Sequence, residues 1–353
     1  MADALTVYGF LSAKLKTRIS AFLPGDRLDD AIRAKSLQEA FLPLRGSYFE
    51  SLENIYSTTG DLKAVEAELF AMEAAAYIEL FHFLEDPALS FVRATARAVE
   101  IEAVKSVLRL WFDAHARGRA IDDRTGYIFR GRVIESLDME AIVNAPTAAD
   151  LVALFRATIY EEIVSRLIPE AVMLGSVFEL ESAMDRLYFE GLFEACSRLN
   201  TKDQEIARRF VGLEVDIQNL TSLVRLRSFH DMPGDKVGRY LIDFGSSVSA
   251  SSLAQAYTTD SIAGAAGALL GHRYENLASI WNKGDTKTRL AALERVLRQV
   301  RVSEAERLLG GYPFSIGIIL SYLVLKTEEL RGVRTVLNAK YYGLAEDRIR
   351  SVV

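Results

Sequence analysis

The chain has 353 residues, of which 50% are hydrophobic and 25% are charged, and its formal net charge is −6. This composition is typical of a folded globular chain and excludes disordered and collagen-like ones, and the length allows two or three domains. The negative charge argues against broad binding to nucleic acid or anionic lipid, because both depend on clustered Lys and Arg.

Apolar residues recur at helical spacing along most of the chain, and only seven prolines interrupt it. In chain order, long stretches without turn residues cover Leu62–Asp86 and Leu151–Leu167, and both are predicted to be helical. A further helix is predicted over Thr286–Leu309, followed by a buried helix over Ile316–Leu325. This last run is shorter than the roughly 20 apolar residues of a membrane span, so we expect no membrane insertion. The predicted fold class is all-α.

One decamer occurs three times, at Glu100–Arg109, Asp216–Arg225 and Glu329–Asn338. Its aliphatic residues fall at positions 2, 5, 8 and 9, which places them on one stripe of a helix and predicts a core helix. We expect the leading acid to lie near the N-terminus of that helix and to interact favourably with the helix dipole, and the alternative is a contact role. The residue at position 4 is Ala103, Asn219 or Gly332, and we expect it to permit close approach of another helix.

A second segment accompanies the decamer in each copy, at Ser36–Ala40, Asp138–Ile142 and Ser252–Ala256. Each begins with a residue that favours the N-cap position, so we expect each to mark a helix start. Two ordered markers with a period near 115 residues predict three helical repeat domains, at residues 1–117, 118–231 and 232–353.

These units, together with the segments Tyr8–Arg18, Leu213–Leu220 and Tyr342–Ile349, resemble the C subunit of archaeal and bacterial V/A-type ATPases. The eukaryotic counterpart is the d subunit of the vacuolar enzyme. The resemblance covers essentially the whole chain. It implies three similar helical domains with pseudo-threefold symmetry that together form a funnel.

The resemblance also implies a function. The chain would be a non-catalytic rotor subunit of the central stalk, a socket between the central-shaft subunits of the D and F type and the proteolipid ring of the membrane sector. It would thereby help to couple ATP hydrolysis or synthesis to ion transport. We expect it to lie in the cytoplasm, peripherally on the cytoplasmic face of the membrane, as part of the ATPase complex.

Sequence motifs for catalysis are absent. No GxxxxGK[ST] phosphate loop occurs, and the four histidines show no HExxH or paired spacing. We therefore predict no catalytic, cofactor-binding or metal-binding residue, and no cofactor. The one cysteine, Cys196, is expected to be a buried, inert thiol.

Two other functions stay open. A helical-repeat scaffold that binds a partner helix or peptide is the first alternative, although a period near 115 residues argues against a standard solenoid. An α-helical enzyme with an unrecognised pocket is the second.

One candidate partner surface lies in the last third of the chain, where 16 Lys and Arg outnumber 12 Asp and Glu over residues 232–353. Arg295, Arg298 and Arg301 recur every three residues on the predicted helix over Thr286–Leu309. They would form a basic ridge that meets an acidic partner. The alternative is a solvated helix face.

Overall fold

The computed structural model describes residues 4–118, 128, 129, 131–230, 232–259, 262, 264, 267, 270 and 285–353. In these residues the regular secondary structure is entirely helical, which confirms the predicted all-α class. None of the helices described is both long and apolar enough to cross a membrane.

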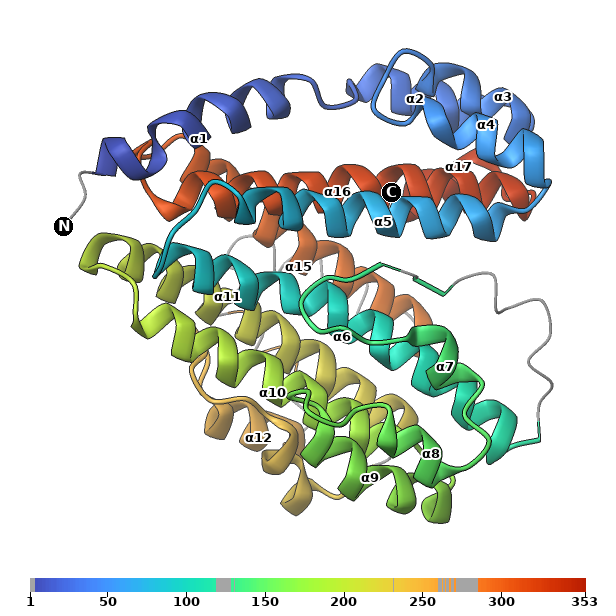
Figure 1. Ribbon diagram of the computed structural model, residues 1–353, viewed down its shortest axis with the longest axis vertical. Helices are drawn as coiled ribbons and strands as arrows, with labels where there is room; N and C mark the ends of the chain where they lie inside the picture. The colour runs from blue at the N-terminus through green and yellow to red at the C-terminus, as the bar shows by residue number, and fades with distance from the viewer. Residues whose placement is uncertain are drawn as a thin grey trace. The chain divides into compact units, whose positions relative to one another are not determined.

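Figure 1 shows the helices in chain order, from α1 at the blue N-terminal end to α17 at the red C-terminal end. They are α1 (Ala4–Ser20), α2 (Gly25–Arg33), α3 (Leu37–Phe41), η1 (Leu42–Leu44), α4 (Glu50–Thr59), α5 (Leu62–Phe81), α6 (Ala88–His115), α7 (Met139–Val143), α8 (Ala148–Ala153), α9 (Glu161–Leu174), α10 (Phe178–Ser197), α11 (Thr201–Arg225), the π-helical turn η3 (Leu226–His230), η4 (Gly234–Tyr240), α12 (Ala250–Thr258), α15 (Thr286–Leu309), α16 (Ile316–Tyr341) and α17 (Glu346–Val352). The observed α15 has the predicted bounds.

The chain forms two compact units. The larger contains Arg18–Ala195, Lys326–Ser351 and Val353, and the smaller contains Met1–Thr17, Cys196–Leu325 and Val352. The first part of α16 therefore belongs to the smaller unit and the remainder to the larger.

Two large hydrophobic clusters stand out among the described residues of the larger unit. In the first, α2 to α5 pack against the C-terminal part of α16, with Phe41, Phe49 and Leu337 fully buried. The second joins α6 to α7, α8, α9 and α10, and its largest member is Trp111, whose indole Nε1 donates a hydrogen bond of 2.8 Å to the Ala145 carbonyl. A buried indole N–H needs such a partner, so this bond fixes the ring within the cluster.

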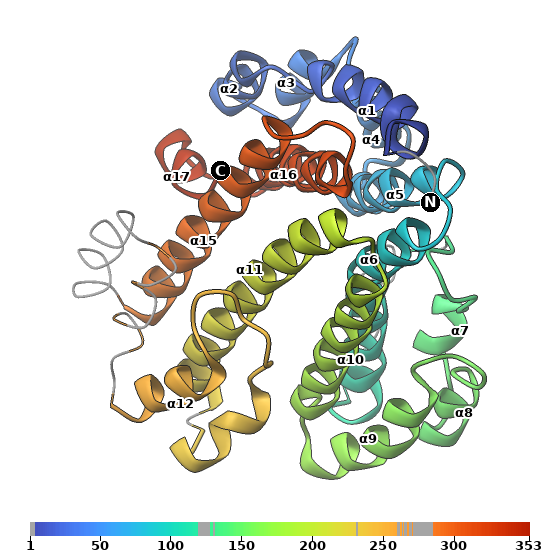
Figure 2. The same ribbon diagram turned by 90° about the vertical axis from the view of Figure 1, so that its left-hand side faces the viewer.

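The smaller unit is organised around α11, which packs against α15 and α12 (Figure 2). Asp203 in the first turn of α11 joins two other helices. Its carboxylate accepts hydrogen bonds from the Tyr8 hydroxyl of α1, at 2.7 Å, and from the backbone N–H of Ile316, at 2.8 Å. The helix that begins at Ile316 is buried as far as Val324, which confirms the predicted core helix.

Several helices begin at residues that cap their first turn. The N-cap side chains that accept a backbone hydrogen bond include Ser36, Asp61, Asp138, Thr147, Asn200, Ser249 and Asp285. The predicted helix starts at Ser36 and Asp138 are thus confirmed. The predicted start at Ser252 is wrong, because α12 already begins after Ser249, whose hydroxyl accepts from the N–H of Ser252.

The link between α3 and α4 has a close counterpart between α8 and α9. In each, a residue with positive φ is followed by a hydroxyl residue and, two positions later, by a fully buried aromatic residue. These residues are Gly46, Ser47 and Phe49 in the first link and Ala157, Thr158 and Tyr160 in the second. In both links the hydroxyl donates to the carbonyl three residues earlier and accepts from the aromatic residue's N–H.

The similarity of these two links changes which residues of the first two copies correspond to each other. Helix α3 follows Ser36 and α8 follows Thr147, so the structural equivalent of Ser36 is Thr147 rather than Asp138. The same link interrupts the stretch Leu151–Leu167, so the prediction of one continuous helix there is wrong. Ala157 adopts a φ of 61°, in the left-handed region that glycine usually occupies, and nothing in the sequence marks the break.

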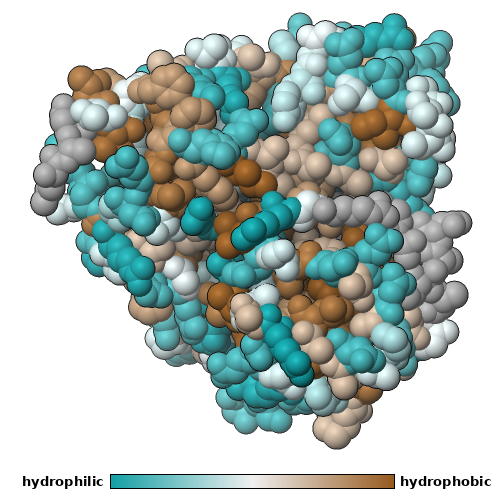
Figure 3. Space-filling view, in the orientation of Figure 1, coloured by the Kyte–Doolittle hydropathy of each residue, from teal (hydrophilic) through white to brown (hydrophobic). Residues whose placement is uncertain are grey.

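Hydrophobic and hydrophilic residues are mixed on the face seen in Figure 3. Exposed large apolar side chains occur at several separate places, for example at Phe10, Met173 and Tyr342. Met173 lies between the exposed Val172 and Leu174, and Tyr342 follows the exposed Tyr341, whereas Phe10 has no exposed apolar residue directly beside it in the sequence.

Candidate functional site

The leading acids of the three decamers lie in the interior of long helices. Glu100 is in α6, Asp216 in α11 and Glu329 in α16, each more than three turns from the first residue of its helix. The expectation that each acid interacts with the dipole at its own helix N-terminus is therefore wrong. The aliphatic residues of the decamers are buried, apart from the half-buried Ile217, which confirms the predicted core stripe.

Glu100 is buried and holds the segment that leads into α7. Its Oε2 accepts hydrogen bonds from the backbone N–H groups of Ile134 and Glu135, both at 2.7 Å. Its Oε1 accepts a bond of 2.6 Å from the Tyr160 hydroxyl. Burial, together with the neighbouring carboxylate, raises the pKa of Tyr160 far above its ordinary value, so the hydroxyl keeps the proton that it donates.

Asp216 holds the segment that leads into α12. Its Oδ2 accepts hydrogen bonds from the N–H of Ser246 at 3.1 Å, the hydroxyl of Ser246 at 2.9 Å and the N–H of Ser247 at 2.8 Å. A Cβ on Gly245 would lie 2.2 Å from Asp216 Oδ1, so only glycine allows this approach. Burial raises the pKa of Asp216 above its ordinary value although these bonds act in the opposite direction.

Glu329 holds the segment that leads into α2. Its Oε1 accepts a bond of 2.6 Å from the N–H of Leu23, and its Oε2 accepts one of 2.8 Å from the ammonium group of Lys326. Lys326 is only 5% exposed. Its Nζ lies 3.8 Å from the ring centroid of Tyr48, 5.1 Å from that of Phe49 and 5.5 Å from that of Phe22, so the charge is compensated by a carboxylate and by three aromatic rings.

The three carboxylates therefore share one role. Each accepts hydrogen bonds from the backbone just before a short helix, which is α7 for Glu100, α12 for Asp216 and α2 for Glu329. The third of these contacts joins the C-terminal part of α16 to the N-terminal part of the larger unit. The decamer repeat thus encodes a core helix together with an anchor for a distant segment.

Position 4 of the decamer differs between the copies. A Cβ at Gly332 would lie 3.3 Å from the Leu28 side chain, which fits the predicted close approach. Asn219 instead clamps a backbone segment, because its amide donates to the Ile242 carbonyl and accepts from the Ile242 N–H, both at 2.8 Å. Asn219 is therefore a second anchor in α11 and not a small spacer.

Helices α11 and α15 are also joined by ion pairs along their length. The pairs run from Arg209–Glu304 through Glu214–Arg301 to Arg225–Glu294. Residue numbers rise along α11 while they fall along α15, so the two helices are antiparallel.

The three arginines of the predicted basic ridge all lie on α15 and are half-buried. Arg301 donates through Nε to Glu214 at 2.7 Å, so it belongs to the pairing between α15 and α11. Arg298 also interacts within the chain. A role of Arg295, Arg298 and Arg301 in binding a partner stays a prediction.

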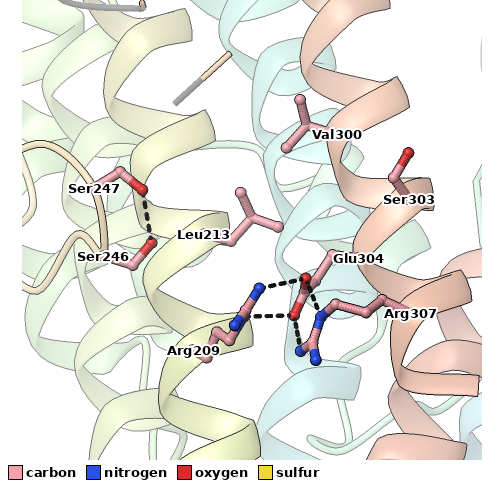
Figure 4. A pocket seen from close by; sticks show the side chains of 8 residues that line it. All are labelled: Arg209, Leu213, Ser246, Ser247, Val300, Ser303, Glu304 and Arg307. Carbon is pink, nitrogen blue, oxygen red and sulfur yellow. Dashed lines mark hydrogen bonds and ion pairs between the residues drawn. The ribbon is translucent and has the colours of Figure 1, made fainter. Parts of the chain in front are cut away.

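A pocket of about 490 Å³ opens beside this pairing in the smaller unit. Its lining residues come from α11, α15 and the segment before α12, and they are Arg209, Leu213, Ser246, Ser247, Val300, Ser303, Glu304 and Arg307. Figure 4 shows the carboxylate of Glu304 between the guanidinium groups of Arg209 and Arg307. Arg209 donates to it at 3.0 and 3.3 Å, and Arg307 at 2.9 and 2.6 Å.

The protonation state of Glu304 follows from these contacts. Burial by itself would raise the pKa of Glu304, but the bonds from Arg307 and the charge of Arg209 outweigh it, and the pKa lies below its ordinary value. Glu304 is therefore ionised at neutral pH, and the group of two arginines and one glutamate carries a net positive charge.

This pocket has no recognisable signal in the sequence. Glu304 and Arg307 stand three residues apart on one helix, a spacing that predicts only a local ion pair. Arg209 is 95 residues away from Glu304, and no pattern in the sequence connects the two.

Cys196 is fully buried in the smaller unit, as predicted. Burial raises the pKa of its thiol to about 11, so the unreactive protonated form prevails at neutral pH.

These observations define an all-helical protein whose long helices carry buried carboxylate anchors and whose surface offers a positively charged pocket. The sequence model of the ATP synthase (C/AC39) subunit family matches residues 11–352. The chain belongs to this family, which confirms the resemblance drawn from the decamers.

Three curated proteins are similar to this chain over nearly its full length. The C subunit of the A-type ATP synthase of Methanocaldococcus jannaschii is 21% identical over 355 residues, covering 100% of this chain and 88% of the relative. The protein of the same name from Thermococcus gammatolerans is 23% identical over 99% of this chain and 90% of its own length. That from Haloquadratum walsbyi is 24% identical over 97% of this chain and 96% of its own length.

Proposed function

We propose that the chain is a non-catalytic rotor subunit of the central stalk of a V/A-type ATPase or ATP synthase. It would join the central-shaft subunits of the D and F type to the proteolipid ring, on the cytoplasmic face of the membrane. Membership of the family over residues 11–352 supports its place in such a complex. In this role the chain transmits rotation and performs no chemistry.

The observation that favours a mechanical role is the set of carboxylate anchors. Glu100, Asp216 and Glu329 each tie a helix interior to a segment far away in sequence, by hydrogen bonds to backbone N–H groups. Charge-assisted bonds of this kind contribute about 1.5–3 kcal/mol each, and they resist relative movement of the segments that they join. A protein that transmits torque needs such internal stiffness.

The three domains at residues 1–117, 118–231 and 232–353, arranged with pseudo-threefold symmetry, are part of this proposal. The shared role of the three acids supports it, because each copy would anchor the start of a corresponding short helix. The repeated link around Gly46 and Ala157 supports the equivalence of the first two copies.

The test removes the protein from the assembled complex. In membrane vesicles that contain the ATPase without this chain, ATP hydrolysis by the soluble head should persist while ATP-driven ion uptake stops. Addition of the purified chain should restore uptake. Ion uptake at the normal rate in its absence would refute the connector function.

A second measurement addresses catalysis. The purified chain should neither hydrolyse ATP nor bind it in calorimetry, since the sequence contains no phosphate loop. Saturable, Mg²⁺-dependent ATP binding would contradict the proposal.

A further inference from the structure

We propose that the pocket between α11 and α15 receives an acidic side chain of a partner protein, with Arg209 and Arg307 as its two donors and Glu304 as the residue that positions them. The proposal rests on the proposed function for the identity of the partner, which is a shaft subunit. It adds the binding site and the chemistry of the group that is bound.

Arg209 and Arg307 each have N–H groups that do not bind Glu304 and that can donate to a further acceptor. A guanidinium group has five N–H groups, and Arg209 and Arg307 each use Nε and Nη2 to bind Glu304. Their side chains are 60% and 49% exposed, so the remaining N–H groups of both can reach a molecule in the pocket. Guanidinium groups oriented by one carboxylate are well suited to bind a second one.

The charge around the pocket favours an acidic occupant. The group of Arg209, Glu304 and Arg307 has a net positive charge, because Glu304 stays ionised between the two arginines. The smaller unit that holds it contains 18 Lys and Arg against 14 Asp and Glu, whereas the larger unit contains 24 against 34. An acidic partner is therefore attracted to the unit that contains the pocket.

The apolar part of the lining indicates the shape of the occupant. Leu213 and Val300 line the pocket beside the charged groups (Figure 4). An apolar wall next to a positive group suits a side chain with a methylene stem and a carboxylate end, which describes glutamate. A free phosphate ion would leave this apolar wall without a contact.

The experiment measures binding of the purified full-length chain to the purified shaft subunits by calorimetry, at low and high salt. Arg209→Gln and Arg307→Gln should each weaken binding about 10- to 100-fold, because each removes a charge-assisted contact. Arg225→Gln is the matched control, since Arg225 also pairs across α11 and α15, with Glu294 at 3.0 Å, and is 55% exposed, but lies outside the pocket. It should leave binding unchanged.

Arg307→Lys separates binding from folding. Lysine keeps the charge and the pairing with Glu304 but presents a single point of contact, so this variant should fold as the wild type does and bind with intermediate affinity. Thermal unfolding of each variant shows whether the fold is kept.

Different outcomes separate this proposal from the proposed function. If the wild-type chain binds the shaft and all variants bind equally well, the pocket proposal is wrong and the connector function stands. If inorganic phosphate binds to the wild type but not to Arg307→Gln while shaft binding is unaffected, the pocket is a small-anion site and the proposal is also overturned. If the wild-type chain does not bind the shaft, both proposals fail.

Discussion

At the scale of single residues, the chain places ionisable groups in its interior where many proteins have apolar ones. Glu100, Asp216 and Lys326 are nearly inaccessible to solvent, and each has specific partners. Burying a charge without partners would cost several kcal/mol, so these partners are a condition of the fold.

Two substitutions of Asp216 test whether its hydrogen bonds stabilise the fold. Asp216→Ala removes the acceptor for the N–H groups of Ser246 and Ser247, and we expect it to lower the free energy of unfolding by about 2 kcal/mol. Asp216→Asn keeps an acceptor oxygen and removes a buried charge, so its effect should stay within about 1 kcal/mol. Chemical denaturation measures both. Equal losses for the two variants would show that the charge, and not the acceptor, is required.

The raised pKa of Asp216 also predicts a pH dependence. Because the pKa is higher in the folded chain than in the unfolded chain, the folded chain binds the proton more readily between these two values. The contribution of Asp216 to stability is therefore greatest at low pH and falls as the pH rises through the folded-state pKa. As the pH rises over this range, the wild type should therefore lose unfolding free energy relative to Asp216→Asn. A difference that is independent of pH would contradict the assignment.

At the scale of secondary-structure elements, the C-terminal part of α16 is attached to the segments before α2 and α4. Lys326 and Glu329 make this attachment, through the N–H of Leu23 and the rings of Tyr48 and Phe49. The lysine is thus a part of the packing between elements and not a surface charge.

A double-mutant cycle tests this attachment. Lys326→Met leaves one oxygen of Glu329 buried without its partner, and we expect a loss of about 3 kcal/mol. Lys326→Met combined with Glu329→Gln keeps the acceptor for Leu23 and removes both charges, so it should be more stable than Lys326→Met alone. If the loss in the double variant equals the sum of the losses in Lys326→Met and Glu329→Gln, the two residues do not act as a pair.

At the scale of the whole molecule, the basic ridge on α15 is the surface that the sequence predicts for partner binding. Because Arg301 pairs with Glu214, its replacement would also disturb the pairing between α15 and α11. Arg298 also interacts within the chain, so a test of the ridge should leave both Arg298 and Arg301 in place.

We expect Arg295→Glu to weaken shaft binding at least about tenfold at low salt, with a smaller effect at high salt. The matched control is Arg208→Glu, which reverses one exposed charge on α11. Calorimetry of both variants measures the difference. If the ridge variant and the control bind alike, the ridge is a solvated helix face.

Hydrophobic periodicity and N-cap residues are local signals, so the all-α class, the core stripe of the decamers and the bounds of α15 could be predicted from the sequence. The order and spacing of the repeated segments also indicated the family. What the acids of the decamers bind became visible only in the tertiary structure. Glu329 binds Leu23, 306 residues away, and Arg209 binds Glu304. The sequence does not predict these pairs, because helical periodicity indicates which face of a helix is buried but not which segment covers it. Tertiary contacts also decide the break between α8 and α9. Ala157 adopts a left-handed conformation that its own side chain does not favour, because the burial of Tyr160 and its bond to Glu100 hold the link in place.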